Sequence, residues 1–227
     1  MADAKLELER IYHRRFDADL EYRNRVWKIL VRDFFSKYYG PQDHVLDLGC
    51  GYGQFINNVE CAQRYAMDLN PESRRMLAGE VRFLEQDCSA PWQLASGSLD
   101  LVFTSNFLEH LPSKDHVSRT LEEAHRCLRT GGRLVALGPN VKYVGGRYWD
   151  FFDHHVPLTE LSLQEGLETA GFDCTKVLPQ FLPYTMVNAP KYPLRFVSWY
   201  LQAPILWRWF GGQFLLVAQR GGNGTSR

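Results

Sequence analysis

The stretch VLDLGCGYGQF, residues 45–55, places three glycines at alternate positions directly after a short apolar run. Because they lack side chains, Gly49, Gly51 and Gly53 let a ligand approach the backbone and permit angles closed to other residues. A dinucleotide-binding turn would carry its third glycine at position 54, where the helix N-terminus faces a pyrophosphate, but Gln54 stands there. The pattern therefore favours a turn for a nucleoside that has no pyrophosphate.

Acidic residues end the next two apolar segments. Asp68 lies 19 residues after Gly49, and Asp87 follows in EQDCSAPW. A carboxylate at the end of the second strand accepts hydrogen bonds from both ribose hydroxyls. The alternative for both acids is a capping role at a strand end or helix start, and Asp47 can serve mainly to hold neighbouring backbone amides. Asp68 is thus the predicted ribose ligand.

Histidines follow the fourth and fifth apolar segments. They are His110 in LEHL and the adjacent His154 and His155 in WDFFDHHVP. A histidine beside a hydroxyl takes its proton as a new bond forms, and Asp150 or Asp153 can orient the ring. The same acids and imidazoles are metal ligands by type, but adjacent histidines on a strand or loop usually point apart. The sequence therefore favours one of these histidines as a general base and no metal site.

The elements that must position these residues alternate along the chain. Strands are expected at 44–50, 64–70, 81–87, 98–108, 133–139, 172–178 and 213–220, and helices at 26–39, 71–79, 114–129 and 158–170, with a further helix starting at 54. This alternation predicts an α/β, doubly wound, mostly parallel sheet with helices on both faces. Ligands of such sheets bind outside the carboxyl ends of the strands, where the glycine turn falls.

Taken together, these motifs resemble the class I S-adenosylmethionine-dependent methyltransferases. The segments that carry the likeness are the glycine turn, Asp68, EQDCSAPW, DLVFTSNFLEHL and HRCLRTGGRLVALGP, within roughly residues 45–139. SNFLEHL and YWDFFDHH are most similar to bacterial members associated with saccharide or secondary-metabolite pathways. The resemblance implies a Rossmann-like sheet of seven strands with the last strand antiparallel, and S-adenosyl-L-methionine as cofactor.

The resemblance also assigns roles in binding the cofactor. Asp47, Gly49, Gly51 and Gly53 would shape the methionine end of the pocket. Asp68 would bind the ribose, Leu69 would pack on the adenine, Asp87 would accept from the adenine amino group, and Cys88 would supply a backbone contact. Asn106 and Phe107 would close the methionine side.

The predicted function is methyl transfer to a small-molecule acceptor, with O-methylation of a saccharide or secondary-metabolite intermediate favoured. The alternatives are N- or C-methylation of a small metabolite, or a non-catalytic module that binds S-adenosylmethionine. A dinucleotide oxidoreductase is disfavoured by Gln54. Methyl transfer is an in-line displacement, so the protein must mainly align the reactants and exclude water. A base is needed only where the acceptor must lose a proton.

We expect one methyltransferase domain over residues 1–220. Residues 1–40 would form a helical cap over the donor, with Arg14 or Arg15 either at the methionine carboxylate or on a solvated basic face. Residues 179–212 form an aromatic-rich insertion before the last strand, and its part 181–212 can add to the core, cover the acceptor, pair with another subunit, or contact a membrane that carries a lipid-linked acceptor. Residues 221–227 would be a disordered tail.

Composition limits the partners. Basic and acidic residues both number 26, so no overall positive field would attract nucleic acid. Five scattered cysteines without CxxC spacing argue against a disulfide framework and a cysteine zinc site. The sequence shows neither a signal-peptide pattern nor an apolar run of membrane-spanning length, so a cytoplasmic location is expected.

Overall fold

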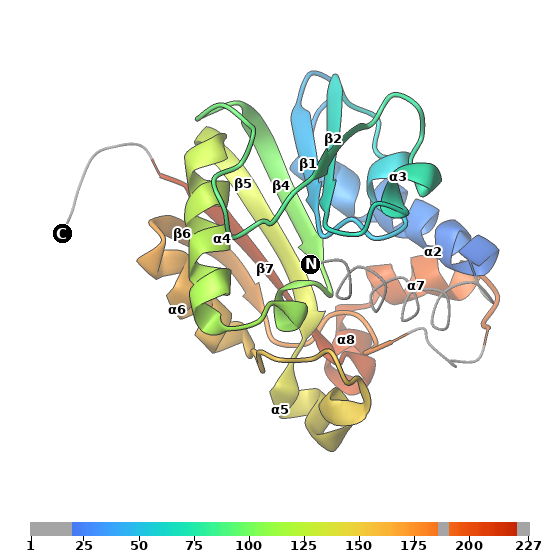
Figure 1. The fold of residues 1–227 in the computed structure, drawn as a ribbon. Helices are drawn as coiled ribbons and strands as arrows, with labels where there is room; N and C mark the ends of the chain where they lie inside the picture. Colours follow the sequence, from blue (N-terminus) through green and yellow to red (C-terminus); the bar gives the residue numbers. More distant parts are fainter. Residues whose placement is uncertain (1–19, 186–190, 222–227) are drawn as a thin grey trace.

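A computed structural model describes residues 20–185 and 191–221 and contains one seven-stranded sheet in the order β3-β2-β1-β4-β5-β7-β6 (Figure 1). The strands are β1 His44–Leu48, β2 Gln63–Asp68, β3 Arg82–Glu85, β4 Leu99–Ser105, β5 Leu128–Pro139, β6 Phe172–Leu178 and β7 Gln213–Arg220. Strands β1 to β5 pair in parallel, whereas β7 runs antiparallel to both β5 and β6. The predicted Rossmann-like sheet with an antiparallel last strand is therefore confirmed.

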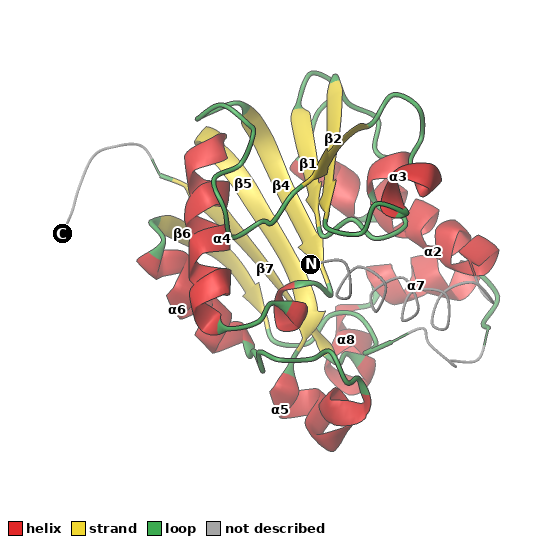
Figure 2. Cartoon of the chain, viewed as in Figure 1, coloured by secondary structure: helices red, strands yellow, loops and turns green. Residues whose placement is uncertain are grey.

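Helices cover both faces of this sheet (Figure 2). Helices α4 (Lys114–Cys127) and α6 (Glu160–Thr169) pack on one face, and Figure 1 shows α4 crossing in front of the strands. The other face carries α2 (Leu20–Asp33), α7 (Arg195–Gln202) and α8 (Pro204–Phe210). Two shorter helices, α3 (Ser73–Met76) and α5 (Val141–Val144), complete the set of α-helices in the described ranges.

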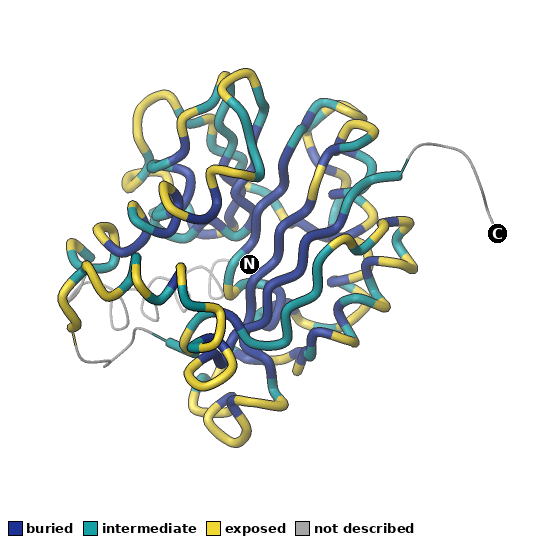
Figure 3. Tube along the Cα trace, turned by 180° about the vertical axis from the view of Figure 1, so that it is seen from behind, coloured by how far each residue is buried: buried dark blue, intermediate teal, exposed yellow. Residues whose placement is uncertain are grey.

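Side-chain alternation along the strands separates two hydrophobic cores. On β4, Val102 faces the core beneath α4 and α6, whereas Leu101 and Phe103 face the core beneath α2, α7 and α8. Successive residues of a strand point to opposite faces, so a strand buried on both sides reads as a continuous apolar run. In Figure 3 the central strands β1, β4 and β7 are correspondingly buried along most of their length, whereas the edge strands β3 and β6 and the outer helices carry more exposed residues.

The first described helix packs through a stripe at helical spacing. Val26, Trp27, Leu30 and Val31 are buried. The expected helix at 26–39 actually begins at Leu20 and ends at Asp33, and a 3₁₀-helix, η2 (Phe35–Tyr38), follows it. The predicted cap is thus described only from Leu20, and Arg14 and Arg15 lie outside the described residues, as do residues 222–227 of the predicted tail. The single-domain boundaries stay a prediction.

Two local expectations were wrong. The glycine turn leads into only a three-residue 3₁₀-helix, η3 (Ile56–Asn58), because the side chains of Asn57 and Asn58 bond to Met76, Ala78 and Gln54 backbone groups instead of leaving a helix to continue. The residues TGG, at 130–132, do not precede the fifth strand but lie within it, since β5 begins at Leu128 opposite Leu99.

Candidate active site

The glycine turn begins where β1 ends. The Gly49 and Cys50 amides donate to the Met67 carbonyl at 2.9 and 3.1 Å, which ties the turn to β2. Gly49, Gly51 and Gly53 have φ values of +70°, +51° and +68°, a region in which side chains are strained. A Cβ on Gly49 would also lie 2.1 Å from Cγ of the Phe107 ring. The turn therefore requires glycine for its own geometry as well as for any ligand.

Asp68 holds the turn from the end of β2. Its Oδ2 accepts from the Gly51 amide at 2.8 Å, and its Oδ1 accepts from the Asn70 amide at 2.9 Å. Burial raises the pKa of Asp68, and the amide hydrogen bonds oppose this shift. The neighbouring Leu69 is 45% exposed and presents an apolar surface. A hydrogen-bond acceptor suits the hydroxyls of a ribose, and an exposed apolar side chain next to it suits the nucleobase.

The loop after β3 carries Asp87 and Cys88. Asp87 is exposed, and its Oδ1 accepts from the amide and hydroxyl of Ser89, both at 2.8 Å. Cys88 is buried, and its carbonyl accepts from the Trp92 indole at 2.7 Å. The geometry places Asp87 at the same sheet edge as Asp68, because β2 and β3 are parallel neighbours.

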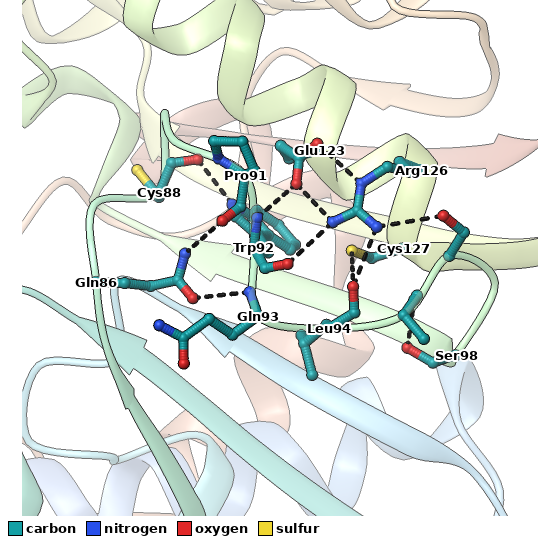
Figure 4. Close-up of polar contacts among 12 residues, drawn as sticks. Gln86, Cys88, Pro91, Trp92, Gln93, Leu94, Ser98, Glu123, Arg126 and Cys127 are labelled. Carbon is teal, nitrogen blue, oxygen red and sulfur yellow. Dashed lines mark hydrogen bonds and ion pairs between the residues drawn. The ribbon is translucent and has the colours of Figure 1, made fainter.

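An ion pair on α4 fixes this loop (Figure 4). Glu123 accepts from the Trp92 amide at 2.6 Å and pairs with Arg126 at the same distance. Arg126 in turn donates to the carbonyls of Trp92 at 3.1 Å and Leu94 at 3.0 Å. The pair is therefore more than a surface contact, because it satisfies backbone groups that the loop leaves without partners of its own.

Asp47 lies beneath the turn. It is 4% exposed, and burial raises its pKa to about 8, with the Ile56 amide opposing the shift and the charge of Asp68 adding to it. Asp47 is thus largely protonated at neutral pH in this state. A cationic ligand nearby would favour its ionised form.

Asn106 and Phe107 follow β4. Asn106 is the one non-glycine residue with positive φ in the described ranges, at +50°, and its amide donates to the Leu137 carbonyl at 3.1 Å. Its side chain reaches Oγ of Ser105 at 3.0 Å and Oε1 of Gln213 at 3.4 Å. Such strained residues cluster at ligand sites. Gln213, from β7, was not expected here because it is distant in sequence.

A cavity of about 880 Å³ opens beside these elements. Asp47, Gly49, Gly51 and Asn106 are among its lining residues. Helix α2 contributes Arg23 and Trp27, and the segment from 182 to 210 contributes mainly apolar and aromatic side chains. Asp68, Leu69, Asp87 and Cys88 are not among its lining residues and occupy the adjoining sheet edge. This volume lies within the range of about 300–1,000 Å³ that is usual for small-ligand sites.

Glu109, His110 and His154 also line the cavity. His110 Nδ1 lies 3.0 Å from the Asp153 carbonyl oxygen and 3.2 Å from its carboxylate. Burial opposes protonation of His110, but the hydrogen bonds that its ring donates to Asp153 and the negative charges of Glu109 and Asp153 outweigh burial, so the pKa of His110 is raised. Burial raises the pKa of Glu109 to about 7. The ring centroids of His110 and His154 are 4.8 Å apart.

The structure narrows the set of candidate bases. His154 is buried and lines the cavity, whereas His155 and Asp150 are exposed and are not among its lining residues. Consecutive residues on this extended segment point apart, as expected, and it is Asp153 rather than Asp150 that orients a histidine. Glu109 was missed from the sequence, where its only signal was its position next to His110.

Comparison with known proteins identifies the fold family. The family model described as a methyltransferase domain matches residues 46–136, which run from β1 into β5. These residues form a class I S-adenosylmethionine-dependent methyltransferase domain. The match confirms the predicted superfamily and, with it, S-adenosyl-L-methionine as cofactor. The site fits that cofactor, since it combines a turn with three glycines, the buried carboxylate of Asp68 and the exposed Leu69.

Individual relatives are distant. A protein of Encephalitozoon cuniculi named as a methyltransferase is 29% identical over 56% of this chain and 61% of its own length. A sarcosine/dimethylglycine N-methyltransferase of Halorhodospira halochloris is 30% identical over 46% of this chain and 40% of its own length. This chain thus spans about half the length of these curated relatives. Among solved structures, a SAM-dependent methyltransferase from Archaeoglobus fulgidus superposes with a TM-score of 0.65 at 18% identity, covering 88% of this chain and 97% of that one.

Proposed function

We propose that the protein transfers the methyl group of S-adenosylmethionine to an oxygen of a small-molecule acceptor, a saccharide or secondary-metabolite intermediate. One observation carries this proposal. One cavity is lined both by the donor turn, with Gly49, Gly51 and Asn106, and by a histidine pair, His110 and His154. A donor and an acceptor bound there would meet within one cavity, and alignment of the two reactants is the main requirement of methyl transfer.

The donor side divides between two ends. Asp47, Gly49, Gly51, Gly53, Asn106 and Phe107 would hold the methionine part, and Asp68, Leu69, Asp87 and Cys88 the adenosine part. The exposed Leu69 and Asp87 would pack on the base and accept from its amino group, and Asp68 would accept from the ribose. When bound, S-adenosylmethionine supplies an electrophilic methyl group on a sulfonium. Arg23 of α2 lines the cavity and donates to Gln54 at 3.1 Å, and it would meet the methionine carboxylate.

The acceptor side rests on His110 and His154. The groups that face Nδ1 of His110 are both acceptors, so Nδ1 carries the proton and Nε2 is the basic nitrogen. A hydroxyl placed against Nε2 would give its proton to the imidazole as its oxygen attacks. His154 is the second candidate, because it is buried and lines the same cavity. We retain His155 and Asp150 only as lesser candidates, since both are exposed.

The segment 181–212 would cover the acceptor and contact a membrane surface. It contains no acidic residue, and its three basic residues are Lys191, Arg195 and Arg208. Trp209 is 77% exposed and Ile205 60%, while other aromatic residues of the segment line the cavity. Exposed aromatic side chains beside basic ones favour the interface of an anionic bilayer. This arrangement supports a lipid-linked acceptor. No helix in the described ranges is long and apolar enough to cross a membrane.

Vesicle binding tests this part of the proposal. Vesicles of phosphatidylcholine with phosphatidylglycerol should sediment the wild-type protein, and the double variant Ile205→Ser/Trp209→Ser should remain in solution. The variant should still bind S-adenosylhomocysteine, because neither residue lines the cavity. Trp149→Ser, which removes a 59% exposed tryptophan from another segment, is the matched control. Equal sedimentation of all variants would contradict a membrane contact through 181–212.

A labelling experiment tests the acceptor class. The protein is incubated with methyl-labelled S-adenosylmethionine and a cell extract, and the label is then followed into protein, aqueous metabolite and lipid fractions. The proposal predicts label on small molecules that disappears with Asp68→Ala. Label that base releases as methanol identifies methyl esters, whereas base-stable label is left on an ether oxygen, a nitrogen or a carbon. Label on protein alone would contradict a small-molecule acceptor, and the absence of any S-adenosylhomocysteine release would favour a non-catalytic binding module. The structure of the labelled product shows whether the methyl group is on oxygen, nitrogen or carbon.

The cytoplasmic location stays a prediction.

A further inference from the structure

A buried carboxylate and two imidazoles converge on the cavity wall. One ligand-type atom from each of Glu109, His110 and His154 lies within 4.8 Å of the others. Three protein ligands of these types with one position left open are the composition of catalytic zinc sites. We propose that Glu109, His110 and His154 bind a divalent transition-metal ion, with zinc as the first candidate, and leave an open coordination position toward the cavity. The sequence alone had favoured no metal site, because adjacent histidines usually point apart, and Glu109 was not among the candidate ligands.

The surroundings of His110 fit a ligand role. A histidine that binds a metal usually donates its other ring N–H to a carboxylate or carbonyl, which fixes the tautomer and the ring. Nδ1 of His110 has both kinds of acceptor, the carbonyl at 3.0 Å and the carboxylate at 3.2 Å, and both belong to Asp153. Nε2 is therefore left with a lone pair for an ion. Asp153 is a positioning residue in this arrangement.

His154 and Glu109 are also held in place. The Glu109 carbonyl accepts from the amides of His155 at 2.8 Å and Val156 at 3.1 Å, which fastens the histidine segment to η4 (Leu108–His110). The His154 ring stacks on Phe151 with centroids 5.0 Å apart and lies 4.5 Å from the ring of Tyr148. Ligands from separate segments are thus brought together by backbone bonds and ring packing before any ion binds.

Charge favours a cation at this place. Glu109 is 2% exposed, and a buried carboxylate is costly unless a cation or hydrogen-bond donors compensate it. Within the described ranges, His110 pairs with Asp153 and supplies at most one positive charge beside the two carboxylates of Glu109 and Asp153. A divalent ion would offset both. At metal–ligand distances of about 2.0–2.1 Å the ligand atoms lie roughly 3–3.5 Å apart. The two ligand atoms that are farthest apart, within 4.8 Å in this structure, must therefore move closer together when the ion binds.

An ion here would define the acceptor more narrowly, and this step rests on the proposed function. A hydroxyl of the acceptor would occupy the open position, where coordination lowers its pKa. Its oxygen would form the new bond to the methyl carbon, the C–S bond would break with its electron pair passing to sulfur, and the hydroxyl proton would pass to water. His110 and His154 would then act as ligands and not as bases. The methyl acceptor would therefore be a compound whose methylated hydroxyl oxygen can coordinate a metal ion.

Metal titration of the full chain tests the site without donor or acceptor. Protein stripped with a chelator is titrated with Zn²⁺ in competition with a chromophoric indicator, and with Co²⁺ by visible absorption. We expect one ion per chain, with affinity at least 100-fold lower in Glu109→Gln and His154→Gln and about 10- to 100-fold lower in Asp153→Asn. His155→Gln, a change at the adjacent exposed residue, should bind as the wild type does. Circular dichroism shows whether each variant is folded.

Two outcomes would overturn the inference. Binding that is equal in the wild type, Glu109→Gln and His154→Gln would place the ion elsewhere, as would a larger effect from His155→Gln. Addition of acetohydroxamate, a small oxygen chelator, should change the Co²⁺ absorption if a coordination position is open; an unchanged spectrum would exclude the open position. A chain that binds S-adenosylhomocysteine and transfers methyl without binding Zn²⁺ would refute the metal site while leaving the proposed function intact.

Discussion

Replacement of Asp68 tests the donor site most specifically. In the free protein its two carboxylate oxygens each accept one backbone amide, from Gly51 and Asn70. With donor bound, the same carboxylate would also accept from the ribose hydroxyls. Asp68→Ala removes all of these acceptors, whereas Asp68→Asn keeps the shape and one oxygen and places an NH₂ group against one of the two amides.

The expected magnitudes follow from these contacts. Loss of charge-assisted hydrogen bonds to the ribose should weaken donor binding by about 2 to 3 kcal/mol in Asp68→Ala, or roughly 30- to 150-fold in Kd. Asp68→Asn should lie between this value and the wild type, because neutral acceptors still form weaker bonds. A backbone amide left without a partner costs about 1–3 kcal/mol, so both variants should also unfold at lower urea.

The assay is calorimetric titration with S-adenosylhomocysteine, together with urea unfolding to show that each variant is folded at the assay temperature. Asp115→Asn is the matched control, since this carboxylate lies on α4 in an exposed pair with Arg119. Its Kd should equal that of the wild type. If Asp68→Ala is folded and binds S-adenosylhomocysteine with unchanged Kd, Asp68 does not contact the ligand and the reasoning fails.

Three further predictions follow from the same geometry. Gly51→Val should abolish donor binding in calorimetry, because φ is +51° there, while Gly79→Val, at a position where a Cβ meets no atom within 4 Å, should bind normally; normal binding by both would make the turn purely structural. Because the pKa of Asp47 is about 8 when folded and near 4 when unfolded, the folded chain keeps a proton that the unfolded chain releases, so the free energy of unfolding should fall between pH 4 and pH 8. Urea unfolding of Asp47→Asn should show a smaller fall over that range, and an equal or opposite slope would contradict the burial of this acid. Arg126→Ala should lower the free energy of unfolding by about 1–3 kcal/mol because backbone carbonyls lose their donor, whereas Arg119→Ala, in an exposed pair, should cost less than about 1 kcal/mol. Equal losses would show that the pair on α4 does not fix the loop.

The sheet could be predicted from the sequence because buried parallel strands produce continuous apolar runs. Strand β1 ends at Leu48, directly before the glycine turn, and strand β2 ends at Asp68. Glycine and aspartate are residue types that commonly end a strand, so both ends could be predicted. Helix α4 was also found, and its Ser113 cap accepts from the His116 amide. Strand ends, the glycine turn and the helix cap depend on residues that are adjacent in sequence, so they can be predicted from the sequence alone.

Other features depend on contacts that are distant in sequence. The short η3 follows from asparagine side chains that bond to the segment around Met76. Helices α7 and α8 were not predicted, because both are rich in aromatic residues and α8 begins at Pro204. Which of His154 and His155 faces inward is set by the two backbone bonds to Glu109. The cluster around Glu109 arises only when η4 meets the segment after η5 (Gly145–Asp150), which no local pattern reports.

The central claim is that the glycine turn and Asp68 hold the nucleoside of S-adenosylmethionine. Calorimetric titration of the wild-type chain with S-adenosylhomocysteine and, separately, with NAD measures this directly. Binding of one S-adenosylhomocysteine per chain with no detectable heat from NAD is the result that this account predicts. Binding of NAD in the absence of any binding of S-adenosylhomocysteine would contradict it.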